Sequence, residues 1–177
     1  ADHADWLKPG LRGLAVADGE GRNSVFMAER GVDTVAMDSS PKAIAKAEAL
    51  ARERGVSVTF QESCILDYDW GEAGFDIVAA IFIQFLAPTE RDAVFARMVQ
   101  ALKPGGVLLL HGYTPEQIAF GTGGPRAVEN LYTEEMLRAA FSDFDIVALR
   151  SYERVLDEGA GHSGRSALID LVARKPT

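Results

Sequence analysis

The chain has 177 residues and a formal net charge of −8, with 47% hydrophobic and 25% charged residues. This length fits one domain with one hydrophobic core, so we expect a single domain over residues 1–177. A protein that neutralises many phosphates needs a basic stripe, and the sequence has no Lys/Arg cluster. Nucleic acids and anionic membranes are therefore poor partner candidates, and a small molecule is favoured.

Other global features point to the cytoplasm. No apolar run approaches the ~18–20 residues that a membrane helix needs. The N-terminus carries acidic residues where a signal peptide would carry basic ones. Cys64 is the only cysteine, so no internal disulfide can form, which suits a reducing compartment. No metal site is expected, since His3, His111 and His162 lack the short spacing of zinc motifs.

Short apolar runs with the length of buried strands alternate with helical patterns along the chain. In chain order, the predicted strands cover residues 11–17, 32–37, 56–60, 75–83, 107–111, 144–156 and 165–174. The predicted helices cover residues 22–29, the segment from Ser40 to the stop at Gly55, 89–102, 115–119 and 136–141.

Caps and turns set the limits of these elements. Ser40 and Pro41 suit the N-cap and the first position of a helix, and Gly31 stands where a C-cap belongs. Thr89–Asp92 resembles a capping box. The turn at residues 159–164 is too short for a crossover, so the last two strands should pair antiparallel.

The order of these elements predicts an α/β fold. Five βα units imply a parallel sheet with helices on both faces, and the terminal β-hairpin adds one reversed strand. We therefore expect a Rossmann-like, doubly wound, seven-stranded mixed sheet that is mostly parallel.

Ligands on such sheets bind beyond the carboxyl ends of the strands, at the switch point. Gly19 and Gly21 let a ligand approach the backbone closely, and the helix after them offers free N–H groups. Asp38, at the tip of the second strand, is placed to accept hydrogen bonds from two ribose hydroxyls. A tight turn and a solvated acid without any ligand are the alternatives. A dinucleotide site lacks its Gly-x-Gly-x-x-Gly fingerprint.

Together these motifs resemble those of class I S-adenosylmethionine (SAM)-dependent methyltransferases, particularly the small tellurite-resistance (TehB-like) group. The resemblance covers most of the chain, and the combination is more specific than any single motif. It rests on residues 18–23, 35–41, 75–78 and 102–108, and for the narrower group on residues 113–117, 121–125, 153–154, 158–159 and 162.

The resemblance implies SAM as the cofactor and methyl transfer to a small-molecule acceptor, with an oxyanion or a soft nucleophile among the candidates. It also implies a set of SAM-binding residues, which runs from the methionine end through the ribose and adenine to the sulfonium: Ala17, Asp18, Gly19, Gly21 and Asn23; Asp38 and Ser39; Cys64 and Ile65; Ala80 and Ile81.

Acceptor-side candidates come from the loops at the same edge. His111, at the end of the fifth strand, could act as a base or make a structural hydrogen bond. Four more residues could face the acceptor or be ordinary surface residues: Arg22, Tyr113, Arg126 and His162.

The chain departs from the family pattern at the cofactor site. Ala15 stands where an acid usually orients the methionine amino group, Ala17 replaces a glycine, and Cys64 replaces the adenine-side acid. Asp18 could supply the missing charge. Only residues 1–10 precede the first strand, whereas relatives carry a segment that closes over the cofactor. A weakly SAM-binding or non-catalytic binding module is therefore the alternative, and an NAD(P)-dependent oxidoreductase is less favoured.

Overall fold

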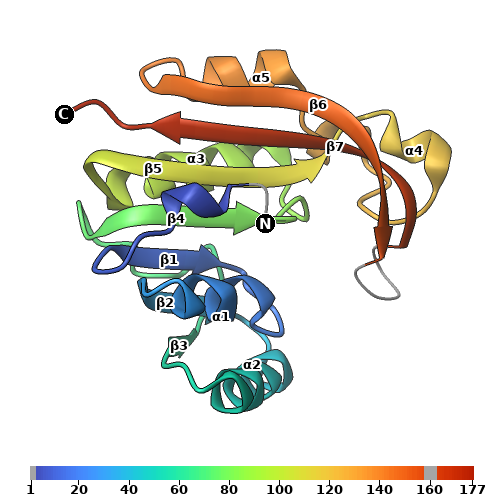
Figure 1. Cartoon of the computed structure of the whole chain (residues 1–177). Coiled ribbons are helices and arrows are strands. Elements are labelled where there is room, and N and C mark those ends of the chain that lie inside the picture. The colour runs from blue at the N-terminus through green and yellow to red at the C-terminus, as the bar shows by residue number, and fades with distance from the viewer. Residues whose placement is uncertain (1–2, 158–162) are drawn as a thin grey trace.

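The computed structural model describes residues 3–157 and 163–177, in which seven strands form one sheet of order β3-β2-β1-β4-β5-β7-β6 (Figure 1). β1 to β5 run parallel, and β7 is antiparallel to both of its neighbours, β5 and β6. The α/β mixed sheet with one reversed strand is thus confirmed. The strands are β1 (Arg12–Val16), β2 (Asp33–Asp38), β3 (Thr59–Glu62), β4 (Phe75–Ile81), β5 (Leu102–Tyr113), β6 (Asp145–Asp157) and β7 (Ser163–Arg174).

The helices follow local signals in the sequence. Ser40 Oγ accepts a hydrogen bond from Ala43 N at 3.3 Å, and the left-handed Gly55 ends the same helix. None of the helices in the described residues is both long and apolar enough to cross a membrane. They are α1 (Arg22–Glu29), α2 (Pro41–Arg54), α3 (Pro88–Ala101), α4 (Gln117–Phe120) and α5 (Glu134–Ala140), with 3-10 turns η1 (Ala4–Trp6) and η2 (Val128–Asn130).

Two local predictions were wrong. The described residues 63–74 connect β3 to β4 as a loop, so the third βα unit has no helix. This loop instead buries two alternate aromatic side chains, Tyr68 and Trp70, whose rings pack edge to face at 5.3 Å. Helix α3 begins at Pro88 rather than at Thr89, because proline suits the first helical position and Glu90 accepts a hydrogen bond from Ala87 N at 3.3 Å.

Each face of the sheet has its own hydrophobic core. Alternate residues of a strand point to opposite faces, so Leu14 and Val16 pack toward α3 and α5, whereas Ala15 packs toward α1. Figure 1 shows α1 and η1 on one face of the sheet and α3 on the other. The face with η1 carries the cavity described below.

Candidate functional site

The loop after β1 is held in a left-handed conformation at three residues. Ala17 has φ +47°, Gly19 has φ +63° and Gly21 has φ +88°. A Cβ at Gly19 would meet no atom within 4 Å, so the backbone there is open to a ligand. A Cβ at Gly21 would lie 2.7 Å from Ala47 Cβ. Gly21 is therefore needed for the packing of α1 against α2, which is a structural demand independent of any ligand.

Asp38 at the tip of β2 joins two of the loops at this edge. Its Oδ2 accepts a hydrogen bond from Gly19 N at 2.9 Å, and its Oδ1 accepts one from Ser40 N at 2.9 Å. A carboxylate oxygen has two lone pairs, so each oxygen can still accept a hydrogen bond from a hydroxyl. Together with the open backbone at Gly19, this arrangement fits the ribose diol of a nucleoside. Ser39 beside it is exposed.

Asp18 has a different environment. Its carboxylate accepts hydrogen bonds from both Ser24 N and Ser24 Oγ, which lie in the first turn of α1. Burial raises the pKa of Asp18 to about 6, against the lowering effect of the two Ser24 bonds. Ala15 is 1% exposed within the core. The Asp18 side chain therefore stabilises the start of α1, and the acid missing at Ala15 has no direct replacement there.

The remaining cofactor candidates are divided between the surface and the two cores. Cys64 follows β3 and is exposed, whereas Ile65 is buried in the core toward α3. Ile81 lines the cavity. Ala80, predicted near the sulfonium, is fully buried in the core on the opposite face, and its neighbour Ala79 lines the cavity in its place. The two-residue period of the strand is the reason.

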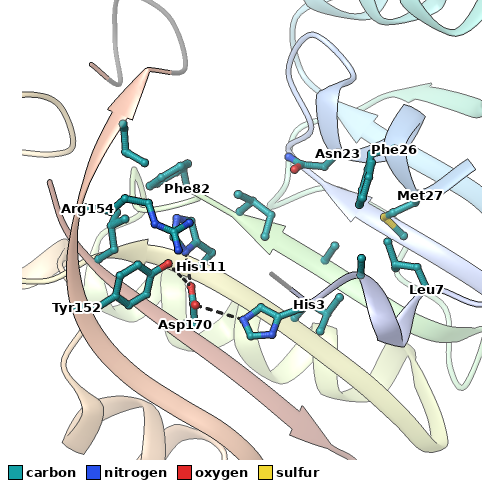
Figure 2. Close-up of a pocket in the computed structure, with 16 residues that line it drawn as sticks. His3, Leu7, Asn23, Phe26, Met27, Phe82, His111, Tyr152, Arg154 and Asp170 are labelled. Atoms are coloured by element: carbon teal, nitrogen blue, oxygen red, sulfur yellow. Dashed lines mark hydrogen bonds and ion pairs between the residues drawn. The ribbon is translucent and has the colours of Figure 1, made fainter. Parts of the chain in front are cut away.

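A cavity of about 260 Å³ lies between α1 and the strands β4 to β7 (Figure 2). Asn23 of α1 and Ile81 of β4 place it next to the cofactor candidates. One side of the cavity is polar and belongs to β5, β6, β7 and the N-terminal turn, as Figure 2 shows. The other lining residues are mainly apolar and include Leu7, Phe26, Met27, Leu109, Leu156 and Leu168.

Asp170 organises the polar wall, although it is only 2% exposed within a strand of apolar residues. It lies opposite His111 on β5 and opposite Arg150 on β6 in the sheet register. Its Oδ1 contacts His111 Nδ1 at 2.6 Å and accepts a hydrogen bond from Tyr152 Oη at 3.1 Å. Its Oδ2 accepts one from Arg150 at 3.1 Å and contacts His3 Nε2 at 3.2 Å.

These contacts decide the charge of Asp170. Burial acts to raise its pKa, but the hydrogen bond and charge of His111, with the bonds from Arg150 and His3, hold the pKa well below its usual range. Asp170 is therefore a carboxylate that only accepts hydrogen bonds, and Nδ1 of His111 must carry the proton between them. A neutral His111 ring then keeps its lone pair on Nε2.

Phe82, directly after β4, packs against the other side of His111. Its ring centroid lies 4.6 Å from that of His111 in an edge-on arrangement, and 4.7 Å from that of Tyr113. Phe82 has φ +56°, which is unusual for a bulky residue. Strained backbone of this kind clusters at functional sites.

The structure brings only part of the predicted acceptor set to the cavity. His111 lines it, whereas Tyr113 is buried beyond it against Phe82. Arg22 and Arg126 are exposed and are not among the described residues that line the cavity. His162 lies outside the described residues.

Sequence reasoning missed the partners of His111. The missed cavity residues are His3, Tyr152, Arg154 and Asp170, together with Arg150, which contacts Asp170. One signal was present in the sequence: Asp170 is the single charged residue in the apolar run 167–173. A buried charge needs partners, so such a position marks a polar network.

A family model described as a methyltransferase domain matches residues 14–106, which is more than half of the chain. The chain belongs to the class I SAM-dependent methyltransferase family. The matched segment runs from β1 into β5 and includes the loop at Gly19 and the tip of β2 at Asp38.

Individual relatives agree with this membership. An uncharacterized methyltransferase from Synechocystis is 28% identical over 105 residues, which are 59% of this chain and 48% of the relative. A carboxy-S-adenosyl-L-methionine synthase from Geobacter metallireducens is 34% identical over 131 residues, which are 70% of this chain and 51% of the relative. The chain thus spans about half the length of these curated relatives.

A solved structure of TehB from Haemophilus influenzae superposes with a TM-score of 0.79 at 19% identity. The match covers 98% of this chain and 60% of the TehB chain. At this identity the likeness concerns the fold alone.

The left-handed backbone at Ala17 yields a stability prediction for this methyltransferase domain. A side chain in this conformation costs about 1–2 kcal/mol, and glycine's extra freedom in the unfolded chain offsets about 0.4–1 kcal/mol of the relief. Ala17→Gly should therefore raise the free energy of unfolding by about 0.5–1 kcal/mol, measured by urea titration. The matched control Ala15→Gly, in the extended backbone of β1, should lower it. If Ala17→Gly is less stable than the native protein, the backbone at Ala17 is not strained.

Asp18 yields a pH prediction. Its pKa in the folded protein is raised from 3.8 to about 6, so the folded state binds the proton more tightly than the unfolded chain. The resulting stability is present below about pH 4 and is lost as the pH rises through about 6. Asp18→Asn should abolish this loss and make the variant about 1–2 kcal/mol more stable than the native protein at pH 7. Urea titrations from pH 4 to 7 measure the free energy of unfolding of both proteins. If it changes with pH equally in the native protein and in Asp18→Asn, the prediction is wrong.

Proposed function

We propose that this domain transfers a methyl group from SAM to a small-molecule acceptor bound in the cavity. One arrangement carries the proposal: Asp38 accepts a hydrogen bond from Gly19 in the loop after β1, and Asn23 of α1, the helix that follows this loop, lines the cavity. A donor held at Asp38 and an acceptor held in the cavity would meet beside Asn23 and Ile81. Family membership supports SAM as the donor.

The residues of the chain fit the nucleoside half of SAM better than its methionine half. Asp38 and the open backbone of Gly19 would hold the ribose, and Asn23 would lie near the methionine end. The carboxylate that the family places at Ala15 is missing, which removes a charge-assisted bond of ~1.5–3 kcal/mol. We therefore expect SAM affinity to depend mainly on the nucleoside half.

When bound, SAM would supply an electrophilic methyl group, with the electron pair of the broken carbon–sulfur bond left on the sulfur of S-adenosylhomocysteine. The protein's part is to position the acceptor and exclude water, since the reactivity belongs to the cofactor. The polar wall around Asp170 would orient the acceptor, and the apolar wall at Phe26 and Met27 would cover its body.

Calorimetric titration with SAM, S-adenosylhomocysteine and NAD tests the proposal. We expect micromolar binding of S-adenosylhomocysteine and no preference for NAD. A folded protein that binds neither SAM nor S-adenosylhomocysteine would refute methyl transfer and leave a non-catalytic binding module. A preference for NAD would instead favour an oxidoreductase.

Asp38→Ala should weaken S-adenosylhomocysteine binding by ~1.5–3 kcal/mol, about 10- to 150-fold, because a charged hydrogen-bond partner of the ribose is lost. Asp33→Ala is the matched control, because Asp33 is an exposed acid at the opposite end of the same strand. Its affinity should equal that of the native protein. Equal affinities for all three proteins would remove Asp38 from the ribose site.

A further inference from the structure

We infer that the cavity takes a small apolar acceptor bearing an ionisable hydroxyl, such as a phenol, and that His111, held by Asp170, accepts the hydroxyl proton. This inference rests on the proposed function and names the acceptor class of the same site. It decides between a soft oxyanion and a protic oxygen, which the sequence leaves open.

The apolar lining of the cavity favours an acceptor with a hydrocarbon body. Leu7, Phe26 and Met27 form the wall opposite Asp170, and Ala79 and Leu109 from β4 and β5 also line the cavity (Figure 2). A compact, fully hydrated oxyanion gains nothing from such a surface, whereas the removal of an apolar ring from water against this surface is favourable. The volume of about 260 Å³ lies below the ~300–1,000 Å³ of sites for drug-sized ligands. The body is therefore about one ring in size.

The polar wall of the cavity favours an acceptor that carries a hydroxyl group. Tyr152 and Arg150 each donate a hydrogen bond to Asp170. Burial and the Asp170 charge raise the pKa of Tyr152, so this phenol stays protonated. His111 also donates through Nδ1 to Asp170, which leaves the lone pair of Nε2 as a proton acceptor on the cavity side of the network. A soft oxyanion attacks through a lone pair and needs no proton removed, and a thiol ionises with little assistance, so this pairing is of most use with a protic oxygen acceptor.

Two contacts fix the imidazole for this task. Asp170 holds Nδ1 at 2.6 Å, and the Phe82 ring meets the imidazole edge-on at 4.6 Å. The surrounding structure maintains Phe82 at φ +56°, a conformation that is unfavourable for a bulky side chain. The ring is thus oriented before any ligand enters.

The proton and electron balance is simple. The acceptor O–H bond breaks, its proton passes to Nε2 of His111, and its electron pair stays on oxygen to form the new bond to the methyl carbon. His111 becomes an imidazolium, which the ionised Asp170 stabilises without taking the proton itself. The proton leaves to water once the methylated product departs.

A chromogenic ligand tests this assignment without SAM. 4-Nitrophenol ionises near neutral pH and its phenolate absorbs in the visible range, so its protonation can be read while it is bound. We expect binding to the native protein to lower the pH at which the phenol ionises by about one unit, a tenfold change in the ionisation equilibrium. His111→Asn should abolish this shift, and His111→Gln is the second variant should the first fail to fold.

Two controls separate a chemical role from a structural one. 4-Nitroanisole has nearly the same body without the proton, so its affinity should be the same in the native protein and in His111→Asn. Arg138→Gln changes an exposed residue of α5 that does not line the cavity and should leave the 4-nitrophenol shift unchanged.

The inference is overturned if 4-nitrophenol does not bind, if it binds without a shift, or if the shift survives the loss of His111. Tellurite binding that excludes 4-nitroanisole would likewise favour the soft oxyanion. Titration of the same samples with S-adenosylhomocysteine distinguishes a failure of this inference from a failure of the proposed function. Cofactor binding without the phenol response refutes only the acceptor class, and absence of cofactor binding refutes the proposed function.

Discussion

The carboxylate of Asp170 ties together the half of the molecule that carries the cavity. It joins β5, β7 and β6 through His111, Arg150 and Tyr152, and it reaches the N-terminal turn through His3. An unpaired charge at 2% exposure would be strongly destabilising, so these partners are required for β7 to lie where it does. The same bonds orient the only side chain of this wall to which we assign a chemical step.

The two halves of the proposed site are formed by different kinds of contact. The proposed nucleoside half lies in the loops after β1 and β2, where the parallel pairing of these strands brings Gly19 N and Asp38 together. The proposed acceptor half lies on the face of β5, β7 and β6 that carries η1, where His111 and Arg150 each lie opposite Asp170 in the sheet register. The first half resembles the family at Asp38 and departs from it at Ala15 and Ala17.

Local signals explain which predictions were confirmed. Helix α1 has the predicted bounds, and α2 lies between the cap at Ser40 and the left-handed Gly55, because caps act over one turn. Residues 63–74 form a loop that buries Tyr68 and Trp70, so the count of five βα units, which assumed a helix in the third unit, was too high. Among the site residues, Asp38 and His111 could be located by their position at strand ends, whereas the outward direction of Arg22 and Arg126 could not.

By itself, the sequence determined the order of strands and helices along the chain and the reversal of the last hairpin. These properties follow from periodicity, caps and chain length, which are local. Only the tertiary structure decided that His111 faces Asp170, 59 positions away, and that Asp18 serves α1. The pairing of His111 with Asp170 depends on the register of β7 between β5 and β6, which is set by packing across the whole sheet, and the role of Asp18 depends on how the loop after β1 turns its side chain toward Ser24.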